Sequence, residues 1–338
     1  MGTDNRVAAY WAGALKGAEW LLQQQSADGS FSSIEEGIDA YYKIPYALAV
    51  TGYPRQAHQL LDWVVREGAL TPEGDLRGKS VKAQSVWHHE CYTYSNSWMV
   101  IGAQRLGRFD FARPAMAYVL KFLSNANGGI FSEPESILTG RGRQDIVVCS
   151  QASSACVYMG RWAEAIQIGD WFVDMLRWQP DIARNLYACS DPETGLIVDY
   201  PADYPLMYVV KAYEPAQWYF YPGIAMGFLS KLYLATGKRE YLDASEGYFD
   251  FTLHCQEDVY RKGQSGKIGW GSAQMYWITG DEKYRRGAVA VGDFLLETQA
   301  DSGLWDLGGP YGSAPATILD ITAEFVVWLA EIAQHLDR

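Results

Sequence analysis

The chain has 338 residues, of which 49% are hydrophobic and 20% charged, and its formal net charge is −12. This balance is ordinary for a globular protein, and the sequence has no run of apolar residues long enough to predict a membrane span. The acidic charge and the lack of a basic run argue against binding to nucleic acid or to an anionic membrane.

The N-terminus and the cysteines predict a cellular location. The first residues, Met-Gly-Thr-Asp-Asn-Arg, contain no apolar core, so we expect no signal peptide. The five cysteines are scattered along the chain and odd in number. Without an export signal, we expect reduced thiols and a cytoplasmic location.

Apolar residues at three- and four-residue spacing predict twelve helices of two alternating kinds. In chain order the predicted ranges are 6–25, 38–51, 54–68, 92–106, 109–125, 145–159, 162–178, 217–236, 239–255, 266–279, 282–299 and 316–336. The first range and every second one after it have one polar face, which predicts outer helices. The others contain more alanine, glycine, serine and aromatic residues and have no clean polar face, which predicts inner helices packed on both sides.

Glycines separate the predicted helices at regular places. Five predicted inner helices end just before a glycine, the residue that adopts a left-handed cap most cheaply: Gly52, Gly107, Gly160, Gly237 and Gly280. The repeating unit is thus a helix, a short glycine turn, a second helix and a loop rich in Gln, Asp and Gly. Six units follow one another without a linker. We therefore predict an all-α fold, a single six-hairpin α/α barrel that comprises residues 1–338 as one domain.

One string of residues recurs where predicted outer helices end. Its first copy has intervals of five, four and two residues: Trp20, Gln25, Gly29 and Phe31. The second copy has the same intervals: Phe294, Gln299, Gly303 and Trp305. A degenerate third copy is formed by Leu120, Asn125, Gly129 and Phe131. Such a fixed string indicates a repeat architecture.

These strings resemble the QW motif of squalene–hopene-type cyclases. The hairpin periodicity, which covers nearly the whole chain, resembles the α/α toroid of terpenoid cyclases, prenyltransferase β-subunits and several sugar-active six-hairpin enzymes. The resemblance implies a scaffold in which the motif braces outer helices, and it says little about the reaction. The Asp-x-Asp-Asp protonation motif of the squalene-type cyclases and the Asp-Asp-x-x-Asp diphosphate motif are absent from the sequence.

The N-termini of the inner helices are the places where we expect the chemistry, since they meet at the mouth of a toroid. Asp39, Tyr42, Lys43 and Tyr46 fall at i, i+3, i+4 and i+7 of the first inner helix, which predicts one shared face. Asp39 is then an acid or base, with Tyr42 or Tyr46 as a proton relay. The alternative is that Asp39 caps the helix and Lys43 pairs with it.

Two further inner segments carry groups that could exchange protons. His88 and His89 are adjacent at the start of the second one, and they lack the spacing of a zinc ligand set, so no metal is expected. Asp320 and Glu324 lie at i and i+4 of the last inner helix. Two facing carboxylates would raise the pKa of one, as a general acid requires. The alternative is that Asp320 bonds a neighbouring inner helix.

Aromatic and polar residues of the inner segments are expected to line the cavity and bind substrate. The densest group follows a long loop at about 179–215. The predicted set is Tyr46, Tyr94, Cys149, Tyr213, Glu214, Trp218, Tyr221, Trp270 and Glu324. The alternative is that the aromatic residues simply fill the centre of the barrel.

The sequence has no Gly-rich nucleotide loop before a helix, so no cofactor is expected. We predict a cofactor-independent acid–base enzyme, a cyclase, isomerase or dehydratase, that acts on a small hydrophobic molecule such as a terpenoid. Its catalytic residues are predicted to be Asp39, Tyr42, Lys43, His88, His89 and Asp320.

Two other functions stay open. The stretch from Gln299 to Trp305 also resembles the unsaturated-uronyl hydrolases, and aromatic rings stack on sugars, which favours a carbohydrate-active hydrolase or lyase. A non-catalytic helical scaffold is the third alternative, and ionisable residues at the inner-helix starts argue against it. The sequence does not address the oligomeric state.

Overall fold

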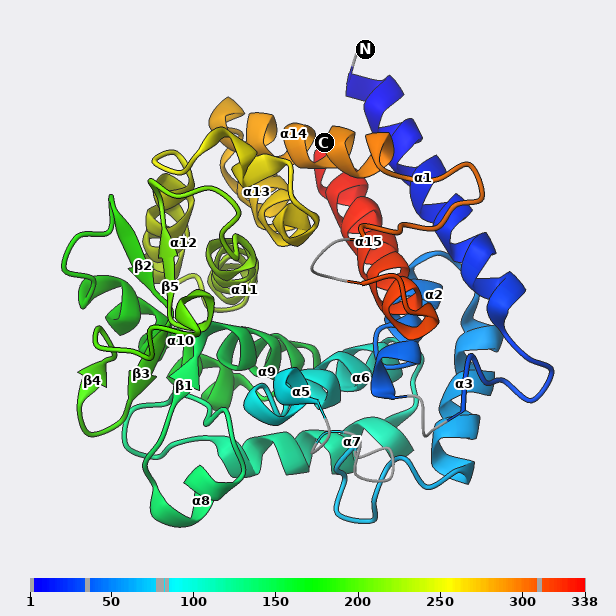
Figure 1. Cartoon of the computed structure of the whole chain (residues 1–338), viewed down its shortest axis with the longest axis horizontal. Helices are drawn as coiled ribbons and strands as arrows, with labels where there is room; N and C mark the ends of the chain where they lie inside the picture. The colour runs from blue at the N-terminus through cyan, green and yellow to red at the C-terminus, as the bar shows by residue number, and fades with distance from the viewer. Residues whose placement is uncertain (1–2, 34–36, 77–81, 83–84, 309–311, 338) are drawn as a thin grey trace. The chain divides into compact units, whose positions relative to one another are not determined.

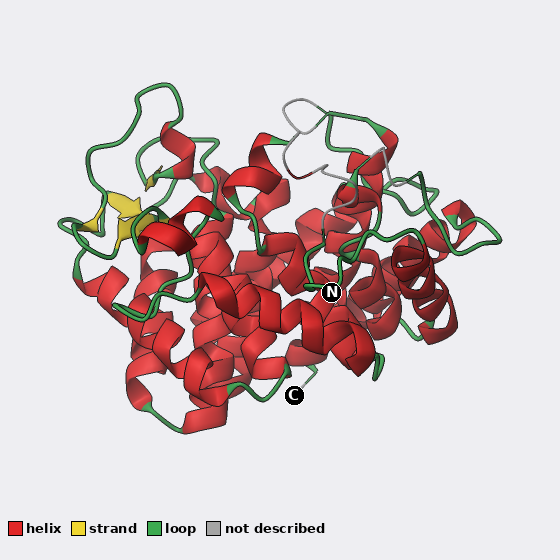
Figure 2. Cartoon of the chain, turned by 90° about the horizontal axis from the view of Figure 1, so that it is seen from below, coloured by secondary structure: helices red, strands yellow, loops and turns green. Residues whose placement is uncertain are grey.

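The computed structural model describes residues 3–33, 37–76, 82, 85–308 and 312–337. Backbone contacts group the chain into two compact units, Met1–Lys121 with Leu295–Asp337, and Phe122–Phe294. Helices dominate both units, and the few short strands gather in loops (Figure 2). The all-α prediction is confirmed, whereas the prediction that the two units form one domain stays a prediction.

The first unit contains the helices from both ends of the chain. They are α1 (Thr3–Gln24), η2 (Ile38–Ala40), α2 (Ile44–Val50), α3 (Pro54–Arg66), α5 (Val86–Glu90), α6 (Tyr94–Arg105), α7 (Phe109–Val119) and α15 (Pro315–Leu336). The last helix, α15, packs along α1 and also against α2 and η2 (Figure 1). In turn, α2 packs on α3 and α6, and α6 packs on α7. Residues more than 270 positions apart thereby become neighbours.

The second unit is continuous in sequence after η3 (Leu120–Phe122). Its helices are α8 (Glu135–Thr139), α9 (Ile146–Tyr158), α10 (Trp162–Arg177), η4 (Pro205–Met207), α11 (Phe220–Thr236), α12 (Arg239–Thr252), η5 (Glu257–Tyr260), η6 (Gly263–Ser265), α13 (Gly266–Thr279) and α14 (Glu282–Glu297), the last three residues of which belong to the first unit. Helix α11 packs against α9, α12 and α13 (Figure 1).

Two small antiparallel sheets lie in the second unit. One has the strand order β1 (Gln144–Asp145), β3 (Cys189–Asp191) and β4 (Gly195–Leu196). The other pairs β2 (Asn185–Tyr187) with β5 (Val209–Lys211), so that Leu186 lies opposite Val210. The sequence analysis placed only a loop at 179–215, because strands of two or three residues leave no periodic pattern to read.

The two predicted kinds of helix are present. Every residue of α6 from Tyr94 to Ala103 is buried, and so is every residue of α9 from Ile146 to Cys156. By contrast, α3 buries Leu60, Leu61 and Val64 and exposes its other face. The predicted turn glycines all have positive φ angles, from 70° to 88°: Gly52, Gly107, Gly160, Gly237 and Gly280.

The glutamine of the recurring string makes the same two contacts in both copies. Gln25 Nε2 donates to the carbonyl of Gly29, at 3.1 Å, and to that of Gln56 at the start of α3, at 3.0 Å. Gln299 Nε2 donates to the carbonyl of Gly303, at 2.9 Å, and to that of Gly13 in α1, at 2.9 Å. Each glutamine therefore closes its own turn and ties the turn to a neighbouring outer helix.

The glycine of the string allows the close approach. Gly29 and Gly303 have φ angles of +96° and +104°, where residues with a β-carbon are strained. A β-carbon at Gly303 would lie 2.3 Å from the carbonyl oxygen of Lys16, and one at Gly29 would lie 2.5 Å from that of Gln59. No other residue fits these positions without moving the helix.

Two further turns of this kind differ from the prediction. In the degenerate copy, the glycine at the close approach is Gly128, with a φ of +81°. A β-carbon added there would lie 2.3 Å from the carbonyl oxygen of Gln167. The predicted residue, Gly129, instead packs on the side chain of Gln144. The structure also shows such a contact at Gly74, where an added β-carbon would lie 2.0 Å from the carbonyl oxygen of Pro114. The position four residues before Gly74 is not a glutamine.

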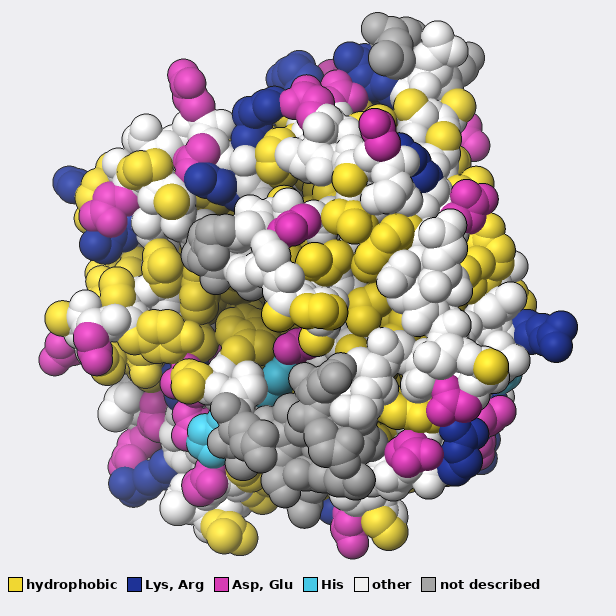
Figure 3. All heavy atoms as spheres, turned by 45° about the vertical axis from the view of Figure 1, so that its right-hand side comes forward, with side chains coloured by type: hydrophobic (Ala, Val, Ile, Leu, Met, Phe, Trp, Pro, Cys, Tyr) yellow, Lys and Arg dark blue, Asp and Glu magenta, His cyan; other side chains and the backbone are white. Residues whose placement is uncertain are grey.

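Among the described residues, no helix combines the length and apolarity needed to cross a membrane. On the face drawn in Figure 3, the coloured Lys and Arg side chains stand singly or in small groups among acidic ones. They form no continuous basic surface on this face.

Replacing Gly303 with alanine should destabilise the protein far more than replacing Gly52. Gly52 has a positive φ of +88° but nothing within 4 Å of an added β-carbon, so Gly52→Ala carries only the backbone strain of about 1–2 kcal/mol. Gly303→Ala adds the collision with α1, and we expect a total of about 4 kcal/mol or more. Urea unfolding of both variants measures the difference, and equal losses would contradict the assignment.

Candidate functional site

The first predicted inner helix is interrupted where the candidate residues lie. Residues 38–40 form η2, and α2 begins only at Ile44, with Pro45 in its first turn. Proline is favoured in the first turn of a helix, because the backbone N–H groups of that turn have no partner within the helix and proline has none to lose. Pro45 therefore favours a helix start at Ile44. The prediction of one continuous helix with Asp39, Tyr42, Lys43 and Tyr46 on a single stripe is therefore wrong. The alternative, in which Asp39 caps the helix and pairs with Lys43, is also not what the structure shows.

Lys43 is held by two carboxylates of α15. Its Nζ lies 2.6 Å from Asp320 Oδ2 and 2.5 Å from Glu324 Oε2. The side chain of Lys43 is 4% exposed, while those of Asp320 and Glu324 are 17% and 13% exposed. The i, i+4 spacing on α15 places both acids on one face, and the ammonium at the start of α2 lies between them.

Burial and charge act in opposite directions on this cluster. Burial alone would lower the pKa of Lys43, but the charges of Asp320 and Glu324 raise it above its ordinary value. Burial raises the pKa of Asp320 to about 6, since it outweighs the attraction of Lys43, and the negative charges of Asp39 and Glu324 add to the rise. Asp320 therefore differs from an ordinary surface aspartate in holding its proton close to neutral pH.

Asp39 has a different partner, which the sequence analysis did not assign to it. Asp39 Oδ1 lies 2.8 Å from His88 Nε2 of α5. Burial would raise the pKa of Asp39, but the hydrogen bond with His88, the electrostatic attraction of His88 and the charge of Lys43 together outweigh it and lower the pKa. The side chain of Asp39 keeps 40% of its surface exposed, whereas that of His88 keeps 2%.

Aromatic rings surround these ionisable groups. The Lys43 ammonium lies 5.0 Å from the ring centre of Tyr42 and 5.8 Å from that of Trp98, within the range of cation–π attraction. Tyr42 makes an edge contact with Tyr94 at 6.1 Å. Trp328 stands edge-on to Trp98 at 5.5 Å, and its Nε1 donates to Glu324 at 3.0 Å. The cluster is thus a charged centre in aromatic walls.

Tyr46 lies one turn further along α2, in a separate network. Its hydroxyl donates to Glu331 Oε1 at 2.6 Å, and Arg105 Nη2 lies 3.2 Å from both that hydroxyl and that carboxylate. Glu331 is buried, so this network links α2 and α6 to the C-terminal part of α15. These contacts favour a supporting role for Tyr46 over the substrate contact predicted for it.

Two polar atoms at the cluster have no hydrogen-bond partner among the described residues. They are Asp320 Oδ1 and His88 Nδ1, and both atoms are buried. Unpaired polar atoms are rare in protein interiors and mark places where a ligand, a proton or water completes the bonding. His89, the other predicted histidine, follows on α5 and is half-buried.

The remaining predicted residues lie in the second unit and mostly bond within it. Cys149 is buried, its Sγ accepts from the N–H of Ile130 at 3.1 Å, and burial raises the pKa of its thiol. Tyr221 donates to the carbonyl of Met207 at 2.8 Å, and Glu214 pairs with Lys211 at 3.0 Å.

The other three aromatic residues of that predicted set differ in burial. Trp218 is half-buried and packs against Phe220 and, edge-on, against Tyr204. Tyr213 is exposed. Trp270 is buried, with the ammonium of Lys231 5.1 Å from its ring. Their roles in binding stay predictions.

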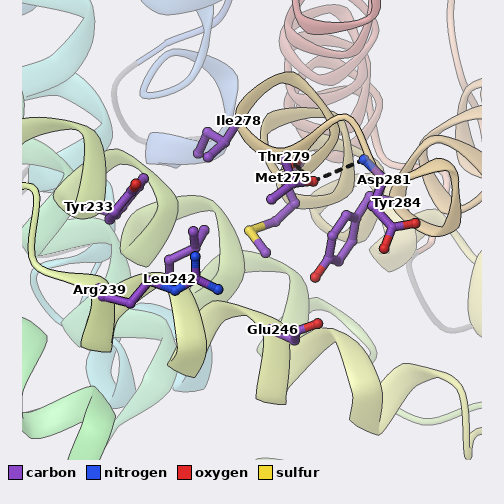
Figure 4. A pocket seen from close by; sticks show the side chains of 9 residues that line it. All are labelled: Tyr233, Arg239, Leu242, Glu246, Met275, Ile278, Thr279, Asp281 and Tyr284. Atoms are coloured by element: carbon purple, nitrogen blue, oxygen red, sulfur yellow. Dashed lines mark hydrogen bonds between the residues drawn. The ribbon is translucent and has the colours of Figure 1, made fainter.

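A pocket of about 390 Å³ opens in the second unit, at the glycine-turn ends of its hairpins. Side chains of α11, α12, α13 and α14 line it, and none belongs to the predicted site (Figure 4). Its charged residues are engaged with neighbours: Arg239 with Asp243 at 2.7 Å, and Glu246 with Lys283 at 2.6 Å. Thr279 accepts from the backbone of Asp281 at 3.2 Å. The acid–base cluster of the first unit is therefore the stronger candidate.

Two residues of the cluster were missed from the sequence. Trp98 lies four residues after Tyr94 and Trp328 four after Glu324, so both share a helix face with a predicted residue. That spacing was the available signal. The pairing of Asp39 with His88 had no such signal, because it joins residues 49 positions apart across a loop.

No protein-family model matches the chain, and no curated protein matches its sequence. Among solved structures it is similar to a GH76 α-mannanase of Bacteroides thetaiotaomicron, at 15% identity and a TM-score of 0.63, with 97% of each chain covered.

Two other solved structures belong to different classes of enzyme. A D-mannose isomerase matches at 10% identity and a TM-score of 0.68, with 96% of this chain and 97% of that one covered. A type II terpene cyclase from Scytonema, solved with geranylgeranyl dihydroxybenzoate, matches at 13% identity and a TM-score of 0.58, with 98% and 99% covered. At these identities the likeness shows the fold alone, that of the α/α toroid enzymes.

The raised pKa of Asp320 should make stability depend on pH in a definite direction. A carboxyl whose pKa is 3.8 when unfolded and about 6 when folded stabilises the folded state below pH 3.8, and this contribution is lost as pH rises through 6. Relative to Asp320→Asn, the wild type should therefore lose on the order of 2–3 kcal/mol between about pH 4 and pH 6. Urea unfolding of both proteins across this range measures the difference. The prediction would be contradicted if the wild type became more stable relative to Asp320→Asn as pH rises.

Removing the ammonium of Lys43 should cost far more than removing a surface ammonium. Lys43→Met leaves two buried carboxylates without their cation, and we expect a loss of about 3–5 kcal/mol at pH 7. The loss should shrink at pH 5, where protons can neutralise the carboxylates. The control is Lys238→Met, whose half-exposed pair with Glu240 at 3.7 Å should contribute less than about 1 kcal/mol. Similar losses in both variants would show that Lys43 is not a structural counter-ion.

Proposed function

We propose that the chain is a cofactor-independent acid–base enzyme in which Asp39 and Asp320 exchange protons with a small-molecule substrate. The observation that supports this is the opposite environment of two carboxylates in the same unit. Lys43 and His88 favour the charged form of Asp39, whereas burial favours the neutral form of Asp320. Two carboxylates with separated pKa values are the usual basis for assigning a base and an acid.

In this proposal Asp320 is the general acid. Its Oδ2 accepts from Lys43, which leaves the unpaired Oδ1 to hold the proton until substrate binding brings an acceptor to it. Lys43 stays charged and compensates the negative charge that Asp320 acquires when it gives up this proton. Glu324 is fixed by Lys43 and by Trp328, which suits a charge-balancing role better than a proton-transfer role.

Asp39 is the general base. It is ionised at neutral pH, and its side chain is the most exposed of the carboxylates in the cluster. A base must reach the proton it removes, and exposure makes this possible for Asp39. The proton then leaves through solvent, which returns Asp39 to its charged form.

The walls of the cluster favour a substrate with a large apolar surface. Tyr42, Tyr94, Trp98 and Trp328 present rings around the charged centre. Aromatic faces suit unsaturated hydrocarbon skeletons and also stabilise positive charge that develops during proton transfer to carbon. We therefore propose isomerisation, cyclisation or elimination of water in a small, largely apolar molecule.

A carbohydrate-active hydrolase is the second candidate. Several GH76 glycoside hydrolases align with 95–97% of the chain, and one α-1,6-mannanase variant in which two aspartates were replaced is described as inactive. A glycoside hydrolase also needs two carboxylates of different pKa. The aromatic side chains could equally stack on sugar rings, so the two candidate functions must be distinguished by identifying the reaction products.

The test is to incubate the protein in D₂O with two sets of probes, unsaturated C10–C20 isoprenoid alcohols and α-1,6-mannobiose with free mannose. Proton transfer to carbon should place deuterium on carbon in an isomerised or cyclised product, and dehydration should yield an alkene with loss of one water. Cleavage of the disaccharide without deuterium on carbon would instead favour the hydrolase. No conversion of either set would contradict both substrate classes.

Substitution of either aspartate should abolish most of the activity without unfolding the protein. Asp39→Asn and Asp320→Asn are nearly isosteric, and each should lower turnover on the order of a hundredfold or more, the usual effect of losing a general base or acid. The control is Asp62→Asn, at an exposed residue that pairs with Arg108.

The pH dependence of turnover gives an additional check. Since Asp320 must be protonated, the rate of the wild type should fall as pH rises through about 6. An Asp39→Asn variant as active as the wild type, together with an inactive Asp320→Asn variant, would contradict the role of Asp39 and favour the hydrolase.

A further inference from the structure

We infer that His88 is a positioning residue that remains neutral and donates its Nε2–H to Asp39, and that it does not itself carry a proton to or from the substrate. This inference rests on the proposed function only in naming Asp39 as the base. The sequence analysis predicted His88 as catalytic. Two features of the structure support the different role: the bonding of the two ring nitrogens, and the burial of the imidazole.

The hydrogen-bond partners of the ring assign its tautomer. Nε2 lies 2.8 Å from Asp39 Oδ1, and an ionised carboxylate can only accept, so Nε2 carries the hydrogen. Nδ1 is buried and has no partner among the described residues. A neutral imidazole leaves only a lone pair at Nδ1, whereas an imidazolium would place a second N–H there without an acceptor. Leaving a buried donor unpaired is the costlier arrangement.

The surroundings hold the ring in this orientation. Ser85 accepts from the backbone N–H of His88 at 3.4 Å and caps α5, which fixes the start of the helix. The ring of Tyr42 stands edge-on to the imidazole at 5.8 Å, with an angle of 89° between the planes. The backbone cap, the ring contact and the Nε2 bond to Asp39 together restrict rotation of the imidazole.

The charged groups near the pair come from two other elements. Lys43, at the start of α2, lowers the pKa of Asp39 and already supplies a positive charge there. Asp320 and Glu324 of α15 are both bound to that same ammonium. Tyr42 is neutral, because burial raises its pKa well above the ordinary value. The charges of this cluster do not by themselves assign the state of the ring, which follows from the unpaired Nδ1 and the burial of the imidazole.

His88 and Asp39 differ in how much of their side chains is exposed to solvent. The His88 side chain is 2% exposed, so a substrate cannot reach its nitrogens without displacing the walls, whereas Asp39 is 40% exposed. Proton transfer thus takes place at the carboxylate. The imidazole orients this carboxylate and keeps it ionised.

The first test is ¹⁵N NMR of histidine-labelled protein, which needs no substrate. We expect His88 to show a protonated Nε2 and an unprotonated Nδ1 at pH 7. The His88→Gln variant identifies its signals by their loss. A protonated Nδ1 at this pH would overturn the inference. Because the readout is not turnover, this result stands even if the proposed function fails.

The second test compares two replacements of His88. Glutamine can place an N–H donor close to the position of Nε2, whereas leucine fills similar space without one. In ¹³C NMR of the Asp carboxyl groups, the titration midpoint of Asp39 should move to higher pH in His88→Leu and by less in His88→Gln. We expect turnover to fall by less than about tenfold in His88→Gln and by on the order of a hundredfold in His88→Leu.

The two replacements also distinguish the possible failures. Thermal unfolding shows whether both variants fold. If both are folded and equally inactive, His88 is itself the proton carrier and the inference is wrong. If Asp39→Asn retains full activity while the NMR result holds, it is the proposed role of Asp39 that fails.

Discussion

The site depends on one buried ammonium group. Lys43 binds Asp320 and Glu324 at the same time, and these partners lie 277 and 281 residues away in sequence. The ion pairs fix the start of α2 against α15 and thereby place Asp39 and Tyr42, which immediately precede that start. Such a buried charge cluster contributes little net stability compared with apolar packing, but it tolerates only one arrangement of its members. It therefore specifies the geometry of the site more than it strengthens the fold.

The two aspartates show how position gives one residue type two chemical roles. Asp320 lies within a helix and keeps one oxygen without a partner among the described residues, so burial dominates and raises its pKa to about 6. Asp39 lies in a short turn at the edge of the cluster, where a neighbouring N–H and a cation favour the charged form. The interruption between Ala40 and Ile44 makes this possible, since a continuous helix would have carried Asp39 onto the same stripe as Lys43.

The helices could be predicted from the sequence because their signal is local. Apolar spacing placed 54–68, 162–178 and 266–279 close to α3, α10 and α13, and the turn glycines adopt the positive φ expected of them. The candidate site was harder, because its contacts are long-range. Lys43 was considered as a partner of Asp39 four residues away, and it is instead bound by α15. The Gly74 turn was missed for a similar reason, since only its contact with Pro114 reveals it.

The order of the two units along the chain has a consequence for biosynthesis. The second unit, Phe122–Phe294, is uninterrupted, whereas the first is completed only by Leu295–Asp337. Until the ribosome releases this last segment, Lys43 lacks both of its counter-ions and α1 lacks the helix that covers it. The contacts of α1 and α2 with α15 can therefore form only after everything between them has been translated. Until then, the apolar surfaces of α1 and α2 that α15 covers stay exposed, a condition that favours aggregation of nascent chains.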